Sequence, residues 1–192
     1  MTSETPATTA ALTVARRFYP PALLDHCVRT RLWGTTYAAA HGIAIDDELF
    51  SVAALLHDMG LTKAFDSHTV PFEEAGGCLG WVFCTAAGWP DERAARAEEI
   101  IVLHMRADVP AADDPEAHVL QVASSFEVVG RWHEQFPDHV RADVLTRHPR
   151  RDFPAGLLAA FEDQARRKPG SAAARSVRNA LAERMAANPL DS

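Results

Sequence analysis

The sequence has too little cysteine for a disulfide framework. Its 192 residues include three cysteines, Cys27, Cys78 and Cys84, and no CxxC pair. An odd number of cysteines without paired spacing is typical of a reducing compartment, so we expect a cytoplasmic protein without disulfides. The sequence also lacks any run of 18 apolar residues, so we expect no membrane-spanning helix. The first 15 residues lack the charged-then-apolar order of a signal peptide, and we expect residues 1–15 to form a flexible tail.

Basic residues are also few, because 19 Lys and Arg stand against 26 Asp and Glu and the formal net charge is −7. This balance excludes a protein that binds nucleic acid through a broad basic face. The charge is unevenly distributed along the chain. Residues 141–192 contain ten basic and six acidic side chains, while the rest of the chain carries the acidic excess. The C-terminal quarter can therefore recognise an anion locally.

Alternation of apolar and polar residues is almost absent, whereas helical spacing recurs throughout the chain. With 47% hydrophobic residues there is enough material for a core. We therefore predict a single all-α domain of about six to eight helices over residues 16–187. The expected helices cover residues 21–41, 47–60, 72–87, 92–105, 115–129, 153–167 and 172–187, with an irregular connection and at most a short helix over 137–153.

The string AALLHDMG at residues 53–60 places His57 and Asp58 side by side at the end of an apolar helix. Neighbouring side chains on a helix diverge by about 100°, so they share a centre only when it lies between their directions. A metal ion is such a centre, because it accepts both an imidazole nitrogen and a carboxylate oxygen. In the alternative interpretation, Asp58 caps the helix and His57 is a hydrogen-bonded core histidine. The pair alone leaves both interpretations open.

Two further polar residues lie on otherwise apolar helix faces. His26 precedes His57 by 31 residues, which suits two antiparallel helices, and Glu127 lies within the apolar stretch 119–129. A buried carboxylate is costly unless it is paired or binds a metal. We therefore predict that His26, His57, Asp58 and Glu127 hold one divalent cation. This donor set suits Zn²⁺ or Fe²⁺, with Mn²⁺ and Ni²⁺ as alternatives.

His26, the His57-Asp58 pair and a later acid resemble the H…HD…D pattern of the HD superfamily of metal-dependent hydrolases. The segments 56–62, 72–76, 103–104 and 126–130 are similar, in this order, to the cyanamide hydratase-like branch, and the resemblance covers roughly residues 18–180. It implies an all-α HD domain. It also implies a hydrolase or hydratase in which a metal-bound water attacks a small cyanamide-like or nitrile-like substrate.

The chain departs from this branch at its last ligand, which is an aspartate in the family and Glu127 here. The longer glutamate reaches about 1–1.5 Å further, which is comparable with the tolerance of a metal site. Dinuclear HD proteins have a histidine where this chain has Phe72, so the resemblance favours a single metal.

Four residues are candidates for catalysis. Asp58 can ligate with one oxygen and accept a proton from water with the other. Glu73 can hold the attacking water, or it can be a solvated acid in the first turn of a helix. His104 can contact the substrate, or it can be an ordinary helix-end histidine. Lys63 lies in the loop after the HD pair and can contact the substrate from there.

Two other functions stay open. An HD phosphohydrolase acting on a nucleotide or another phosphomonoester would use the same activated water, with Lys63 or the basic run 147–151 holding the phosphate. That run also fits a solvated loop. A non-catalytic HD module for binding or assembly is the third interpretation. In every case we expect a small-molecule ligand, no nucleic acid and no membrane partner, and the sequence leaves homo-oligomerisation open.

Overall fold

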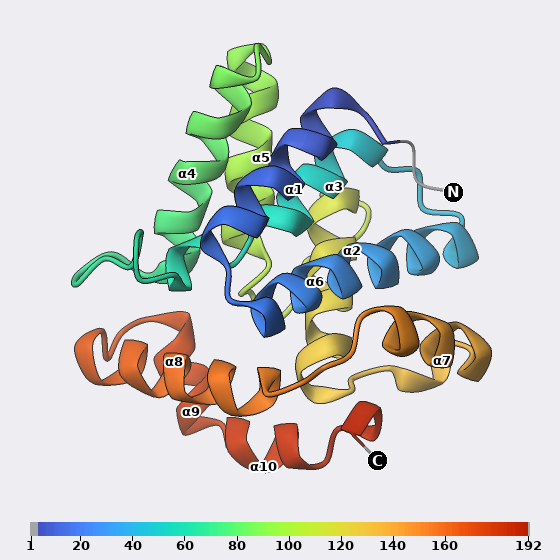
Figure 1. Cartoon of the computed structure of the whole chain (residues 1–192), viewed down its shortest axis with the longest axis vertical. Helices are drawn as coiled ribbons and strands as arrows, with labels where there is room; N and C mark the ends of the chain where they lie inside the picture. The colour runs from blue at the N-terminus through green and yellow to red at the C-terminus, as the bar shows by residue number, and fades with distance from the viewer. Residues whose placement is uncertain (1–3, 192) are drawn as a thin grey trace.

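The computed structural model describes residues 4–191, and all regular structure in this range is helical (Figure 1). The predicted all-α fold is confirmed. The ten helices are α1 (Pro6–Phe18), α2 (Pro21–His41), α3 (Asp47–Leu56), α4 (Phe72–Ala86), α5 (Asp91–Leu103), α6 (Pro115–Val129), α7 (Asp138–Arg147), α8 (Phe153–Arg167), α9 (Ala172–Arg178) and α10 (Leu181–Ala186). None of these helices is long and apolar enough to cross a membrane.

Helices α2 and α6 lie at the centre of the molecule (Figure 1). Helices α1, α3, α4 and α5 lie on one side of them, and α7 to α10 lie on the other. The main core contains Trp33, Phe50 and Phe126, which are fully buried. A second, smaller cluster includes Phe153 and Phe161 and packs α8 to α10 against the centre. The space between these two clusters is where the candidate site lies.

Several helix boundaries follow from the residues at the helix ends. The Asp46 side chain accepts hydrogen bonds from the first turn of α3, including the Leu49 amide at 3.0 Å. Asp114 accepts from the Ala117 amide at 3.0 Å and begins α6, which ends at Gly130 with φ of 70°. The predicted ranges 21–41, 115–129 and 153–167 coincide with α2, α6 and α8.

The prediction of a flexible tail over residues 1–15 is wrong for its described part, because residues 6–18 form α1. The Thr5 side chain accepts a hydrogen bond from the Thr8 amide at 3.2 Å and caps this helix. Ala11 and Ala15 are fully buried in the main core. Alanine gives a weak periodic signal, so the sequence does not indicate the packed face of α1. Residues 1–3 lie outside the described residues.

The chain after residue 137 is more interrupted than the sequence predicts. The ten-residue helix α7 is the one helix that the sequence allowed within the connection over 137–153. The single helix expected over 172–187 is divided into α9 and α10. Ala180, between them, adopts left-handed backbone angles with φ of 56°. These differences raise the number of helices above the expected six to eight.

Candidate metal centre

Helices α2 and α3 position three of the four predicted metal ligands. His26 lies on α2 beside Cys27, while His57 and Asp58 directly follow α3. The next turn, Met59–Leu61, packs tightly against the start of α4. A Cβ atom on Gly60 would lie 2.1 Å from the carbonyl oxygen of Phe72, so only glycine permits this approach. The glycine two residues after Asp58 therefore permits the turn to pack against α4.

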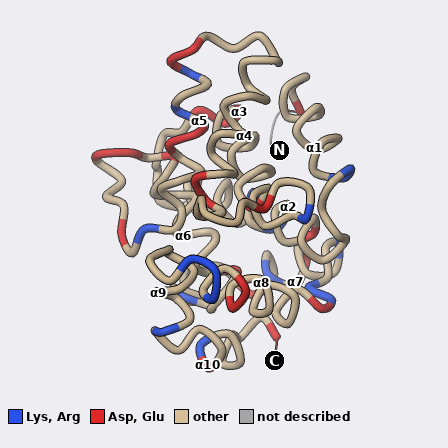
Figure 2. Tube along the Cα trace, turned by 90° about the vertical axis from the view of Figure 1, so that its left-hand side faces the viewer, with Lys and Arg blue, Asp and Glu red and all other residues tan. Residues whose placement is uncertain are grey.

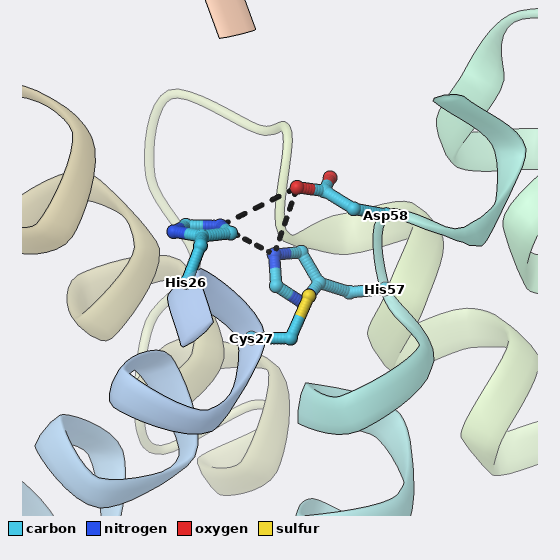
Figure 3. A group of neighbouring side chains, drawn as sticks. All are labelled: His26, Cys27, His57 and Asp58. Atoms are coloured by element: carbon cyan, nitrogen blue, oxygen red, sulfur yellow. Dashed lines mark hydrogen bonds and ion pairs between the residues drawn. The ribbon is translucent and has the colours of Figure 1, made fainter. Parts of the chain in front are cut away.

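Three donor atoms of the predicted ligands form a small triangle (Figure 3). The Nε2 atoms of His26 and His57 are 3.2 Å apart. The Oδ2 atom of Asp58 lies 3.3 Å from the first and 3.5 Å from the second. All three side chains are buried. The 31-residue spacing between the histidines therefore does bring them together across α2 and α3.

The Nε2 lone pair of His57 points into this triangle. Its Nδ1 atom donates a hydrogen bond to the Ala54 carbonyl oxygen at 2.8 Å, which leaves Nε2 unprotonated in the neutral ring. Burial lowers the pKa of His57 to about 3, so the ring is neutral near pH 7. Burial opposes ionisation of Asp58, yet the imidazoles of His57 and His26 outweigh it and hold the pKa of Asp58 well below its usual value. A neutral imidazole and an ionised carboxylate are the states that bind a metal.

The spacing of these donors fits a small divalent cation. Tetrahedral ligands with bonds of about 2.0–2.2 Å are separated from one another by about 3.3–3.6 Å. The three measured separations of 3.2, 3.3 and 3.5 Å are close to this range. With the Cys27 thiol, the donors of the four residues lie within 4.8 Å of one another. This buried cluster can therefore hold a metal ion.

Glu127, the fourth predicted ligand, is not part of this cluster. Its Oε1 atom accepts hydrogen bonds from Arg29 at 2.7 and 2.9 Å and from Arg150 at 2.8 Å. Its Oε2 atom accepts from the Trp33 indole at 2.7 Å. Burial opposes ionisation of Glu127, but Arg29 and Arg150 outweigh it and lower its pKa to about 2. The geometry therefore corrects the prediction, because this carboxylate is paired with arginines instead of facing the other donors.

The three predicted helper residues lie in different places. His104 is buried, and its Nε2 atom is 3.9 Å from Asp58 Oδ1, so the structure brings it into the site. Glu73 is also buried, and its Oε2 atom has no hydrogen-bond partner within residues 4–191. It lines a separate cavity of about 290 Å³ beside the main one. Lys63 is exposed and lines neither cavity, so the structure does not place it at the site.

A cavity of about 700 Å³ opens onto His26, His57, Asp58 and His104. Its wall includes four arginines that the sequence analysis did not select, Arg106, Arg131, Arg175 and Arg184. The basic charge of the C-terminal quarter was the one sequence feature that pointed to Arg175 and Arg184. It does not show that their side chains line the cavity. The predicted basic run 147–151 has other contacts. Arg150 pairs with Glu127 and Asp191, and Arg151 pairs with Asp25.

No model of a known protein family matches the chain, and no curated protein matches it in sequence. The functional assignment therefore depends on the geometry of the cluster and of the cavity above it.

Proposed function

We propose that this protein is a metal-dependent hydrolase or hydratase of the HD type. In this proposal His26, His57 and Asp58 hold one divalent cation, Zn²⁺ or Fe²⁺. The observation that carries it is the triangle of donor atoms with edges of 3.2–3.5 Å. Two imidazole lone pairs at this distance repel each other unless a cation or a proton lies beside them. A metal ion bound between them removes this repulsion, and imidazole and carboxylate donors are typical ligands of such an ion.

The two oxygens of Asp58 have different surroundings, which supports a double role for this residue. Oδ2 faces the two histidines, whereas Oδ1 faces His104 Nε2 at 3.9 Å. A bound divalent cation would lower the pKa of a water molecule towards neutrality and polarise an electrophile. We propose that Asp58 Oδ1 accepts the proton of this water, since it lies beside the cluster.

His104 is the second group that can hold the proton. Its Nδ1 atom contacts the Ile101 carbonyl oxygen, so its Nε2 lone pair faces Asp58. Burial lowers the pKa of His104, which makes the ring a neutral acceptor near pH 7. Its place in the main cavity lets it pass a proton to a substrate bound there. Glu73 is proposed only to hold water in the adjoining cavity, where its unpartnered oxygen lies.

The first candidate reaction is the addition of water to a nitrile-like carbon, as the resemblance to cyanamide hydratase-like proteins implies. The second candidate, hydrolysis of a phosphomonoester, is favoured by the size of the cavity. A volume of about 700 Å³ lies in the range of about 300–1,000 Å³ that holds drug-sized ligands, whereas cyanamide has three non-hydrogen atoms. The four arginines in its wall also suit a phosphate.

Metal analysis of the purified protein tests this proposal. We expect about one equivalent of Zn or Fe in the wild type and little in Asp58→Asn, which keeps the shape of the side chain but removes its charge. Asp108→Asn is the matched control, because Asp108 lines the mouth of the same cavity and is exposed. Release of urea from cyanamide or of phosphate from 4-nitrophenyl phosphate, lost on chelation, then identifies the reaction. A wild type that binds no divalent metal would contradict the proposal and favour a non-catalytic module.

A further inference from the structure

Four arginines of the main cavity have no carboxylate partner. Arg106, Arg131, Arg175 and Arg184 form no ion pair within residues 4–191. Arg175 donates only to a backbone carbonyl, that of Gly170 at 3.4 Å. Arg131 stacks on the ring of Trp132 at 3.9 Å. Their guanidinium groups therefore remain available for an anion that enters the cavity.

Most arginines outside the cavity differ, although Arg16, Arg17 and Arg178 also form no ion pair within residues 4–191. Arg29, Arg93 and Arg96, for example, each pair with carboxylates of neighbouring elements. The chain has a net charge of −7, yet the cavity wall carries four arginines and two aspartates, Asp58 and Asp108. Figure 2 shows Lys and Arg positions gathered around α9 and α10, on the side of the molecule that contributes Arg175 and Arg184. The cavity is thus a local basic region on an acidic protein.

The cavity wall has polar residues such as Gln121, Ser124 and Asn179 and also an apolar part. The apolar part includes Leu157 and Phe161 of α8, Val128 and Val129 of α6, and Leu181 of α10. Such a surface binds an apolar body, because burying it there removes it from water. The same cavity is lined by the buried histidine-aspartate cluster and by the four arginines, which are exposed.

We infer that the main cavity binds an organic anion, a molecule with an apolar body and a phosphate or carboxylate group held by Arg106, Arg131, Arg175 and Arg184. This inference rests on the proposed function, since it names the substrate class of the same site. Arginine suits both anions, because its planar fork donates two parallel hydrogen bonds to a phosphate or a carboxylate. Cyanamide, which is small and uncharged, uses neither the arginines nor the apolar wall.

Direct binding to metal-free protein tests the inference without any activity. After chelation and dialysis, phenylphosphonate, benzoate and the uncharged benzamide are titrated by calorimetry into the wild type and into Arg175→Gln/Arg184→Gln. We expect phenylphosphonate or benzoate to bind the wild type at least about tenfold more tightly than benzamide. We expect the double variant to bind the better of the two anions about tenfold more weakly than the wild type does. The stronger of the two anions identifies the charged group of the substrate.

The matched control is Arg178→Gln, which changes the same charge on the same helix. Arg178 is exposed on α9 but does not line the cavity, so its loss should leave the affinity nearly unchanged. A second pair, Arg106→Gln/Arg131→Gln, tests the arginines that follow α5 and α6. The inference is overturned if benzamide binds as tightly as the anions, if no anion binds at millimolar concentration, or if Arg178→Gln weakens binding as much as the double variant.

Failure of this inference is distinguishable from failure of the proposed function. Metal content and its loss in Asp58→Asn depend on the donor cluster, whereas binding of the probes is measured with the metal removed. A protein that binds metal but no anion retains the hydrolase or hydratase proposal and loses the organic-anion substrate. A protein that binds anions but no metal retains the organic-anion ligand and contradicts the hydrolase or hydratase proposal.

Discussion

Glu127 Oε1 lies 3.7 Å from Nδ1 of His26, while Nε2 of the same ring faces His57 at 3.2 Å. The carboxylate therefore lies next to Nδ1 of the His26 ring, on the side that faces away from the donor cluster. A carboxylate in this place favours a proton on Nδ1, which leaves the Nε2 lone pair free for a metal. The ring is also held by Phe153, which stacks on it at a centroid distance of 4.2 Å. At 3.7 Å the contact is electrostatic and not a hydrogen bond, and we predict that it makes Glu127 a positioning residue for His26.

The first prediction concerns Glu127→Gln. We expect a loss of about 3–5 kcal/mol in the free energy of unfolding, because Arg29 would remain buried without a carboxylate and Arg150 would keep only Asp191. We also expect metal affinity to fall about tenfold or more, as is typical when the partner of a ligating histidine is removed. Denaturant unfolding and metal titration measure the two effects separately.

Asp191→Asn is the control for this prediction. Asp191 pairs with Arg150 at 2.6 Å, so its loss disturbs the same ionic network, but it has no contact with His26. We expect reduced stability and unchanged metal affinity. Equal metal affinity in the wild type and Glu127→Gln would show that Glu127 is structural only.

The second prediction compares two glycines. Gly60→Ala should destabilise the protein by about 1–3 kcal/mol or more and weaken metal binding, since its Cβ would meet the Phe72 backbone. Gly156→Ala in α8 has open space around its Cβ and should stabilise the protein by up to about 1 kcal/mol. Thermal unfolding of both variants checks this prediction, and equal melting temperatures would contradict it.

The third prediction is a loss of stability in acid for the metal-free protein. Burial lowers the folded-state pKa of His57 from 6.5 to about 3, so the unfolded chain takes up this proton first as the pH falls below 6.5. The free energy of unfolding should then decrease by up to about 1.4 kcal/mol per pH unit. The contribution of His57 is complete above pH 6.5 and is lost progressively towards pH 3. Glu127 acts in the same direction below pH 4.5.

Unfolding curves at several pH values measure this slope. His57→Gln should flatten it, whereas His139→Gln, which changes an exposed histidine of α7, should not. A stability that is constant between pH 7 and pH 4 would contradict the prediction.

The fourth prediction separates Cys27 from the metal ligands. Burial raises the pKa of its thiol well above the usual value, and the marked contacts of the cluster do not include it (Figure 3). We therefore expect Cys27→Ser to retain metal with an affinity changed by less than about threefold. The cobalt-substituted wild type should lack a sulfur-to-cobalt charge-transfer band. Its presence, or loss of metal in Cys27→Ser, would make Cys27 a ligand.

Sequence patterns predicted the central helices because their end residues have direct chemical effects. Asp114 with Pro115 begins α6 and Gly130 ends it, so its boundaries could be predicted from three residues. The convergence of His26 with His57 could also be predicted, since two antiparallel helices of known length place residues 31 positions apart side by side. These features depend on local structure and on a single helix pair.

The partner of Glu127 could not be predicted in the same way. A carboxylate on an apolar face needs a compensating charge, and the sequence does not say whether a metal or an arginine supplies it. Arg29 lies one turn beyond His26 on α2, so both face α6, and this was the only local signal. Arg150 reaches Glu127 from the connection between α7 and α8, which is a long-range contact. The cavity arginines are long-range features for the same reason.

The left-handed backbone at Ala180 decides the direction from which α10 meets the cavity. Arg175 and Arg184 are nine residues apart, and on an unbroken helix with about 100° per residue they would point to opposite sides. Because the chain turns at Ala180, both line the same cavity. An alanine with φ of 56° carries strain of about 1–2 kcal/mol. The turn at Ala180 therefore replaces one continuous helix, whose two arginines would point to opposite sides, by two short helices. These approach a bound molecule from different directions.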